Sequence, residues 1–324
     1  MISNHSVIDA CENTVRIEEE TNIWREVKMN EKAKKTAKLI FPSTVTLVIA
    51  LTMMTGCSKR EGGTGSEQRF ITIKGSDTMV HLASSWAETF MQQNTDIEVS
   101  VTGGGSGTGI AALLNGTTDI CAASRKIKNK ELQLALQKNI HPHEIAVAKD
   151  GIAVVVHPDN PVKELTLEQL SKIFTDKSLR WSNVGGADKE ILVLSRESSS
   201  GTYVFFQEMV LKKQDYMQDA KLMPATSAII QSVSTDKLAI GYVGLGYALA
   251  AKDKVKIIAV KADDNSPAVM PSDQTVKTGH YPIARPLFMY LNGEPQGTVK
   301  TFMDFCLSAA GQKVVTDTGY VAVR

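Results

Sequence analysis

The sequence has little net charge and few histidines and cysteines. Its 36 lysines and arginines almost balance 35 aspartates and glutamates, which leaves a formal net charge of +1 over 324 residues. A chain without an excess of one sign offers no broad electrostatic surface to nucleic acid, so we expect no nucleic-acid partner. The segment His141-Pro142-His143 has no further ligands near it in the sequence and is more typical of a surface turn. We expect neither a metal nor a cofactor.

Cysteine is scarce as well, which excludes a domain built on disulfides. Only four cysteines are present, and their spacing is not that of a disulfide framework. Cys11 and Cys57 lie in the N-terminal part of the chain, whereas Cys121 and Cys306 lie within apolar patterns. A disulfide between the last two is one alternative. We favour two buried thiols, because no short loops surround either residue.

The one long apolar run lies close to the N-terminus. Residues 29–56 combine a basic segment, MNEKAKKTAK, with the apolar stretch LIFPSTVTLVIALTMMTG. Threonine and proline interrupt this stretch, so it is a poor candidate for a membrane-spanning helix of the mature protein. It ends in the small residues Thr55 and Gly56, directly before Cys57. The order resembles a bacterial lipoprotein signal, in which Cys57 is acylated, for example with palmitate, and becomes the first mature residue.

This resemblance divides the N-terminal part of the chain into three segments. Residues 1–28 are acidic and polar, and we interpret them as an upstream extension from a mis-assigned start, with Met29 as the true start. Residues 57–68 are polar and glycine-rich, which is typical of a flexible tether. An ordinary secretory signal or a membrane anchor is the alternative. The lipoprotein interpretation predicts a protein anchored to the outer face of the cell membrane.

From Phe70 onward the sequence alternates between strand-like and helix-like patterns. Such alternation predicts an α/β fold with a mostly parallel sheet and helices on both faces, in which ligands bind at the carboxyl ends of strands. Apolar residues at helical spacing predict single helices in 79–90, 130–139 and 301–315. The predicted strands are 70–74, 97–102, 119–124, 144–157, 191–195, 240–250, 254–260 and 284–292.

Three predicted strand-to-helix turns have the same composition. They are GSDT at 75–78, GGGSGTGI at 103–110 and RESSSGT at 196–202, and each combines glycine with small hydroxyl residues. The first turn of a helix carries unpaired N–H groups, glycine lets an anion approach them, and hydroxyls add donors. Three such turns that converge would surround a tetrahedral oxyanion. Arg125 and Arg196 could add charge-assisted contacts.

Each turn taken alone has a simpler explanation. A serine before a helix is often only a cap, and Arg125, in a basic run, is often only a solvated charge. The glycine-rich turn is not a triphosphate loop, because Ile110 and Ala111 stand where lysine and a hydroxyl residue are required. It matches GxGxxA, but no acidic residue follows at the distance expected for a ribose. Thr108 stands where the motif for a nucleophilic Ser106 requires glycine.

Several segments together resemble the PstS-type phosphate-binding proteins of phosphate ABC transporters. They occur in order and cover nearly all of 70–324. The resemblance implies a two-lobed periplasmic-binding-protein fold of type II, in which each lobe is a mostly parallel sheet flanked by helices and two crossover strands join the lobes. We expect lobe 1 at 69–152 plus 283–324 and lobe 2 at 153–282. The segments are RESSSGT, GGGSGTGI, TTDICAASR, LTLEQLSKIF with a later Trp181, IGYVGLGYA and YPIARPLFMY.

The same resemblance implies a function without catalysis. Such a protein binds inorganic phosphate between its lobes, outside the cytoplasm, and delivers it to the permease subunits of an ABC transporter for import. We expect a monomer. The phosphate-binding residues carried over by position are Ser76, Asp77 and Thr78 in the first loop, Ser106 in the second, and Arg196, Ser200, Gly201 and Thr202 in the third.

One departure from the family pattern affects selectivity. Well-understood members carry an aspartate after the third strand, where this chain has Ser124 or Arg125. A carboxylate there accepts the proton of phosphate and disfavours sulfate, since a buried acceptor facing sulfate would have no partner. Our hypothesis is that Asp77 takes over this task. The alternatives are a protein for another oxyanion, such as sulfate, molybdate or tungstate, and a hydrolase that uses Ser106 or Ser200.

Overall fold

The structure is a computed structural model that describes residues 70–323. The predicted upstream extension, signal, acylation site at Cys57 and tether lie outside the described residues. Within 70–323, no helix has both the length and the apolar character needed to cross a membrane. The free thiols of Cys121 and Cys306 are both buried, as expected, and burial raises the pKa of Cys121 to about 12.

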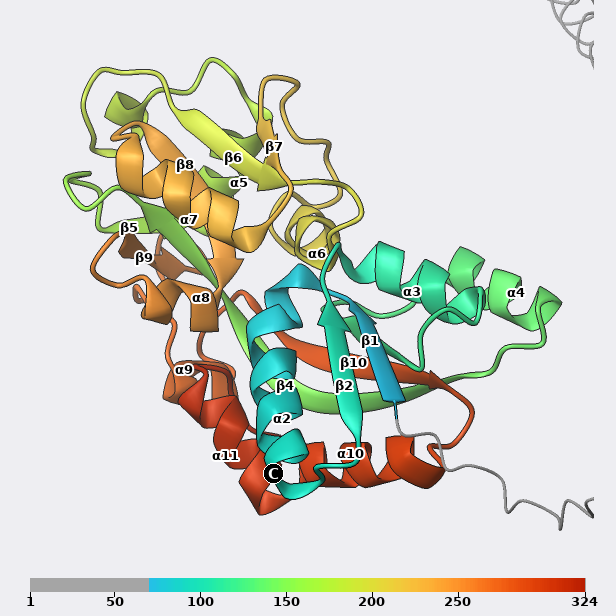
Figure 1. Ribbon diagram of the computed structural model, residues 1–324. Coiled ribbons are helices and arrows are strands. Elements are labelled where there is room, and N and C mark those ends of the chain that lie inside the picture. Colours follow the sequence, from blue (N-terminus) through green and yellow to red (C-terminus); the bar gives the residue numbers. More distant parts are fainter. Residues whose placement is uncertain (1–69, 324) are drawn as a thin grey trace, which may run out of the picture. The chain divides into compact units, whose positions relative to one another are not determined.

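Strands and helices alternate along the described chain, as the sequence pattern predicted (Figure 1). The first half contains β1 (Phe70–Gly75), the 3-10 helix η1 (Asp77–Met79), α2 (Val80–Gln93), β2 (Glu98–Thr102), α3 (Ser106–Leu114), β3 (Ile120–Ala123), α4 (Asn129–Gln137), β4 (Pro142–Val156), β5 (Glu164–Thr166), α5 (Leu167–Thr175), the 3-10 helix η2 (Trp181–Val184) and β6 (Leu192–Arg196). The second half contains α6 (Gly201–Met209), β7 (Lys221–Met223), α7 (Thr226–Thr235), β8 (Ala239–Gly244), α8 (Leu245–Ala250), β9 (Lys256–Lys261), α9 (Asp273–Lys277), β10 (Ala284–Asn292), α10 (Gly297–Leu307) and α11 (Ala309–Asp317).

The described strands form one mixed sheet. Its main order is β2-β1-β3-β10-β4-β8-β6-β7, and β9 pairs with both β4 and β5 beside this path. The pairings of β1 with β2 and β3, of β6 with β7 and β8, and of β5 with β9 are parallel. Every pairing that involves β4 or β10 is antiparallel. The predicted parallel character therefore holds outside these two strands.

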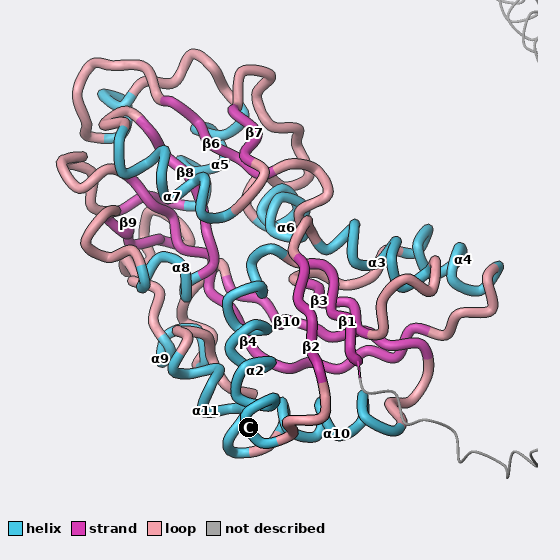
Figure 2. Tube along the Cα trace, in the orientation of Figure 1, coloured by secondary structure: helices cyan, strands magenta, loops and turns pink. Residues whose placement is uncertain are grey.

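The strands β4 and β10 join two lobes. They pair with each other along 142–151 of β4, and the last residues of β4 then pair with β8 and β9 (Figure 1). In Figure 2 both strands continue from the group around β1–β3 toward the group around β6–β9. The fold is thus the two-lobed α/β fold expected from the sequence, with β4 and β10 as the crossover strands.

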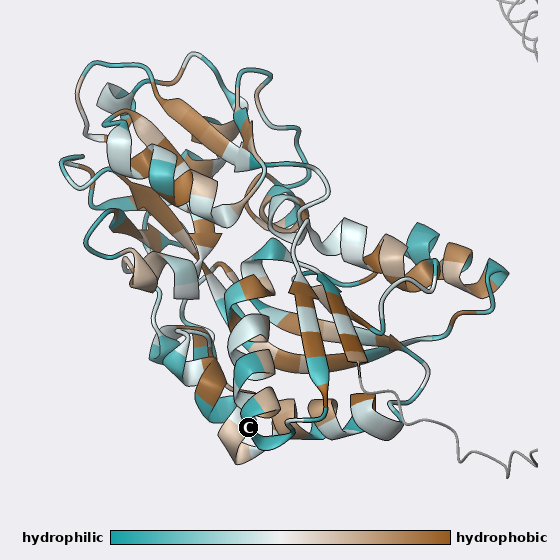
Figure 3. Cartoon of the chain, viewed as in Figure 1, coloured by the Kyte–Doolittle hydropathy of each residue, from teal (hydrophilic) through white to brown (hydrophobic). Residues whose placement is uncertain are grey.

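Each lobe has hydrophobic clusters of its own. One pair of clusters is built from β1–β3, α2–α4, β10, α10 and α11, and the other pair from α5–α9, β6 and β8. The strand β4 contributes to both, with Val147 on one side and Val154 on the other. Figure 3 shows the apolar residues concentrated on the strands and the hydrophilic ones on outward parts of the helices. Two cores connected by two strands are the arrangement that allows hinged motion.

Two predicted elements need correction. The predicted single helix at 301–315 is two helices, because Ser308 has an extended backbone and its Oγ accepts a hydrogen bond from Gly311 N at 3.2 Å as the cap of α11. The predicted strand at 240–250 ends at Gly244 and continues as α8. At the start of α5, Thr166 and Gln169 form a capping box with reciprocal bonds of 2.9 and 3.1 Å.

Candidate functional site

The three glycine-rich loops meet at the junction of the lobes. Gly105 N of the second loop donates to Gly75 O of the first at 2.9 Å. Gly107 N, at the start of α3, donates to Ser199 O of the third loop at 2.9 Å, although the two residues belong to different lobes. Gly105 has φ +113°, and a side chain there would lie 2.7 Å from Ser199 O. Glycine is thus required where the loops approach one another.

Hydroxyl groups of lobe 1 form a buried cluster beside this junction. Ser76 Oγ donates to Ser124 Oγ at 2.9 Å, and Ser106 Oγ lies 3.2 Å from the same atom. Ser124 N also donates to Ser106 Oγ at 2.9 Å. These three serines are between 0 and 3% exposed. The structure therefore brings together one predicted residue from each of three chain segments of lobe 1.

The first residue of α6 faces this cluster from lobe 2. A methyl group added to Gly201 would lie 2.3 Å from Ser106 Oγ and 2.6 Å from Ser124 Oγ. Ser200 caps the helix, since its Oγ accepts bonds from Thr202 N at 3.2 Å and Tyr203 N at 3.4 Å. The start of α6 thus lies against hydroxyls of the opposite lobe, and the positive end of a helix dipole beside hydroxyls is a favourable environment for an anion.

A second hydroxyl contact connects the lobes directly. Thr78 Oγ1 of lobe 1 and Thr202 Oγ1 of lobe 2 are 2.7 Å apart. Both residues are nearly inaccessible to solvent, at 1 and 2% exposure. An anion bound between the lobes would accept hydrogen bonds from hydroxyls of this junction, and because the pair is buried, the anion could enter only when the lobes separate.

Arg196 and Asp77 form an ion pair across the lobes. Arg196 Nη1 lies 3.2 Å from Asp77 Oδ2, and the two side chains are 3 and 17% exposed. Arg196 also donates to Met223 O, Pro224 O and Thr226 Oγ1 at 3.2, 3.0 and 2.8 Å. These bonds hold the guanidinium in place at the carboxyl end of β6, next to the third loop.

Asp77 also contacts a fourth helix start, which the sequence reasoning missed. Its Oδ2 accepts bonds from Thr226 N at 2.7 Å and Thr226 Oγ1 at 2.6 Å, so a lobe 1 carboxylate caps α7 of lobe 2. The sequence feature that could have indicated this helix start is a hydroxyl residue, Thr226, after Pro224 and Ala225. The hypothesis that Asp77 accepts the proton of phosphate must therefore rely on its other oxygen, Oδ1.

Arg125 is not directed at the hydroxyl cluster. Its two terminal nitrogens donate to the two carboxylate oxygens of Glu131 at 2.8 and 2.7 Å, and Nη1 also reaches Lys126 O at 2.9 Å. Burial of Glu131 opposes ionisation, but the bonds from Arg125 and from Lys128 N outweigh it and lower the pKa of Glu131. Of the two residues after β3, the structure places Ser124 in the cluster and Arg125 in a separate ion pair.

Two further charged residues beside the site were missed. Arg285 of β10 donates to Thr202 Oγ1 and to Ser124 O, both at 2.8 Å, and it pairs with Asp150 of β4 at 3.2 Å. The sequence signal was a charge within otherwise apolar strand patterns, YPIARPLFMY and AVAKDGIAVVV. A charged side chain within a buried strand requires a buried partner of opposite charge, but the sequence does not identify that partner.

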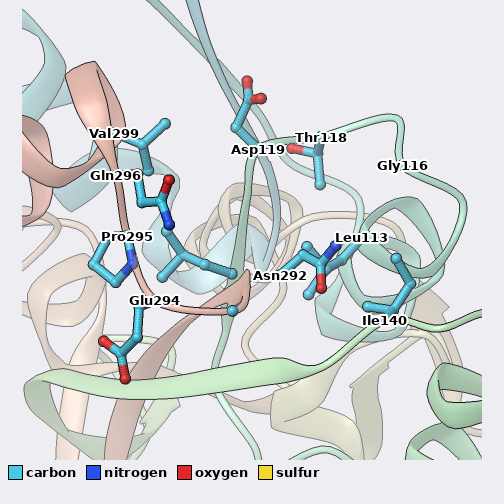
Figure 4. Close-up of a pocket in the computed structure, with 12 residues that line it drawn as sticks. Leu113, Gly116, Thr118, Asp119, Ile140, Asn292, Glu294, Pro295, Gln296 and Val299 are labelled. Carbon is cyan, nitrogen blue, oxygen red and sulfur yellow. The ribbon is translucent and has the colours of Figure 1, made fainter.

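A hollow elsewhere in lobe 1 is unsuited to an anion. It has a volume of about 470 Å³ and lies at the amino end of β3, whereas Ser124 follows the carboxyl end of that strand (Figure 4). Asp119 and Glu294 lie at its edge, and none of the described residues that line it is lysine or arginine. Their negative charges would repel an oxyanion.

Comparison with known proteins places the chain in a family. A profile of the PBP superfamily domain matches residues 58–310. A phosphate-binding protein PstS from Staphylococcus epidermidis is 35% identical over 286 residues, which cover 86% of this chain and 87% of that protein. The phosphate-binding protein PstS of Pseudomonas aeruginosa is 34% identical over 264 residues, covering 76% of this chain and 81% of that protein.

Solved structures agree with the sequence comparison. A structure from Clostridium perfringens, described as a phosphate ABC transporter substrate-binding protein with bound phosphate, matches with a TM-score of 0.71 and 31% identity. The match covers 79% of this chain and 100% of that chain. The fold is therefore that of this substrate-binding protein. This chain belongs to the PBP superfamily and, within it, to the family of PstS phosphate-binding proteins.

Proposed function

We propose that this protein binds one inorganic phosphate ion between its lobes, outside the cytoplasm, and delivers it to the permease of an ABC transporter for import. One observation carries the proposal: helix starts and hydroxyls from both lobes meet around Gly201, within hydrogen-bond distance of one another. Helix N-termini with glycine and hydroxyl donors suit a tetrahedral oxyanion. The names of the relatives point to phosphate as that anion.

The proposed phosphate-binding residues are those that meet at this junction. They are Ser76, Asp77, Thr78, Ser106, Ser124, Arg196, Ser200, Gly201 and Thr202. Arg125 stays a prediction with weaker support, because both its terminal nitrogens are bonded to Glu131. The proposed lobe boundaries, 69–152 plus 283–324 and 153–282, are supported by the separate hydrophobic clusters, except that Ile152, Ile283 and Val321 pack in the cluster of lobe 2.

We also propose that the protein has no catalytic activity. Hydrolysis by Ser106 or Ser200 would require a base beside the hydroxyl. Among the described residues, Ser106 Oγ bonds only to Ser124, and Ser200 Oγ bonds only to backbone N–H groups of its own helix. A chromogenic phosphate ester tests this proposal, and the expected turnover is none above the rate without protein.

Calorimetric titration tests the choice of anion. Purified protein is titrated with phosphate, sulfate, molybdate and tungstate at constant ionic strength. We expect saturable binding of one phosphate per chain and at least about 100-fold weaker binding of the other three, since a site that pairs with the proton of phosphate disfavours anions without one. Preferential binding of another oxyanion would overturn the proposal.

The lipid anchor at Cys57 and the monomeric state are proposed on the sequence. Mass spectrometry of the protein from membranes of expressing cells checks the anchor, with an acylated peptide that begins at Cys57 as the expected result. Light scattering checks the monomer.

A further inference from the structure

The two crossover strands carry a buried ion pair. Asp150 of β4 and Arg285 of β10 are direct partners in the strand register, and Arg285 Nη2 lies 3.2 Å from Asp150 Oδ2. Their side chains are 0 and 2% exposed. Burial raises the pKa of Asp150, although Arg285 opposes this effect. A buried pair seldom stabilises a fold more than apolar residues would, so its other contacts are informative.

Those other contacts connect the pair to both lobes. Arg285 Nη1 donates to Ser124 O of lobe 1 at 2.8 Å, and Arg285 Nη2 donates to Thr202 Oγ1 of lobe 2 at 2.8 Å. Asp150 Oδ1 accepts a bond from Leu245 N, the first residue of α8, at 3.0 Å. The guanidinium also lies 5.3 Å from the ring of Phe205, on α6. Arg285 therefore holds a residue of the hydroxyl cluster and the start of α6 at the same time.

The bond from Arg285 to Thr202 determines which further hydrogen bonds the Thr202 hydroxyl can make. A hydroxyl has one hydrogen and two acceptor positions. Arg285 occupies one acceptor position of Thr202 Oγ1, and Thr78 Oγ1 lies 2.7 Å from the same atom. One of the two hydroxyl hydrogens is used in the bond between the threonines, whichever of them donates. The second hydroxyl hydrogen remains for a third partner, and an anion can accept it.

We propose that Arg285 is a positioning residue of the anion site. By donating to Thr202 Oγ1, it leaves the Thr78–Thr202 pair with a hydroxyl hydrogen that can be donated to the anion. It also places a positive charge behind that pair, separated from the bound anion by the hydroxyl groups. Because it reaches both lobes, it forms its full set of bonds only when the lobes are closed. This inference rests on the proposed phosphate binding, and it adds a residue that does not itself contact the anion.

A double-mutant cycle in phosphate affinity separates positioning from simple structural support. The variants are Arg285→Met, Thr202→Val and the double variant, with the dissociation constant measured by calorimetry. We expect Thr202→Val to weaken binding about 10-fold and Arg285→Met about 50-fold, as a charge-assisted bond would. If Arg285 acts partly through the Thr202 hydroxyl and partly through its charge, the double variant is at most about threefold weaker than Arg285→Met alone. Effects that multiply to about 500-fold would overturn the inference.

Two further variants make the test robust. Arg285→Lys keeps the charge and can still donate to Thr202, so we expect it to recover at least about fivefold of the affinity lost in Arg285→Met. It also serves if the methionine variant fails to fold. Arg180→Met removes an exposed pair with Asp188 instead, and unchanged affinity is expected. A lysine variant no tighter than the methionine variant would contradict positioning by charge.

The result also distinguishes this inference from the proposed function. Wild-type protein that fails to bind phosphate contradicts the proposed function. Wild-type protein that binds phosphate, together with an Arg285→Met variant that unfolds more easily in urea but binds phosphate with unchanged affinity, contradicts only the positioning role.

Discussion

Asp77 has two tasks at the junction that a pair of substitutions can separate. Its Oδ2 pairs with Arg196 and caps α7 through Thr226, whereas Oδ1 has no hydrogen bond in the described part of the chain. Asparagine keeps the size and one oxygen acceptor but removes the charge. We expect Asp77→Asn to weaken phosphate binding about 10-fold and to reduce the preference for phosphate over sulfate, since the charge no longer opposes a fully ionised anion.

Calorimetry with both anions measures this preference. Thr226→Val is the companion variant, because it removes the hydroxyl partner of Asp77 and retains the carboxylate. It should weaken binding without changing the ratio of the two affinities. An Asp77→Asn variant with an unchanged ratio would rule out a role for Asp77 in selectivity.

The pair of Arg125 with Glu131 predicts a pH dependence of stability. Because the folded state lowers the pKa of Glu131, its contribution is present above the pKa of the unfolded chain, near 4.5, and is lost as the pH falls through the folded value. We expect Glu131→Gln to cost about 1 kcal/mol at pH 7, a figure reduced for solvent screening, and less at pH 3. Urea unfolding at both pH values measures this difference.

The exposed pair of Glu168 with Lys172 is the matched control. Glu168→Gln should leave the unfolding free energy unchanged at pH 7 within error. A Glu131→Gln variant whose cost is the same at pH 3 as at pH 7 would show that the ion pair is not the source of the stability.

At the scale of elements, the start of α6 determines how closely the lobes approach. A methyl group on Gly201 would overlap with Ser106 Oγ and Ser124 Oγ of the opposite lobe, and neither contact lies within lobe 2 itself. Gly201→Ala should therefore leave the melting temperature nearly unchanged while weakening phosphate binding at least about 100-fold. Gly107→Ala, with its nearest contact at 3.2 Å, should have a smaller effect.

Thermal unfolding and calorimetry on the same samples separate these outcomes. A Gly201→Ala variant that binds phosphate as tightly as the wild type would mean that α6 does not close on the serines. A large loss of melting temperature would instead place Gly201 in the core of lobe 2.

The elements that could be predicted from sequence are those set by local chemistry. In each of the three loops, the glycines and hydroxyl residues lie within a few residues of one another and directly before an apolar helical pattern. The helix starts that follow these loops were therefore predictable. Arg285 and Asp150 are 135 residues apart, and only the pairing of β10 with β4 brings them together. The break at Ser308 was missed because the apolar pattern continues across it. Arg125 pairs with Glu131, six residues further along the chain. Sequence alone does not show whether an arginine contacts such a carboxylate or a bound anion.

At the scale of the whole molecule, the proposed site needs residues from both lobes. Lobe 1 supplies Ser76, Thr78, Ser106 and Ser124, lobe 2 supplies Arg196 and Thr202, and the crossover residue Arg285 touches both. Each lobe alone would offer an incomplete set of donors. The proposed site therefore predicts that closure of the lobes is coupled to phosphate binding, and that the closed, loaded form presents a surface of its own to a permease.

The crystal structure of the protein grown with phosphate tests the central claim most directly. The account predicts one tetrahedral density at the junction, within hydrogen-bond distance of Ser106 Oγ and Thr78 Oγ1 from lobe 1 and of the α6 N-terminus and Arg196 from lobe 2. A phosphate bound to one lobe alone, or located in the acidic hollow beside Asp119, would contradict it.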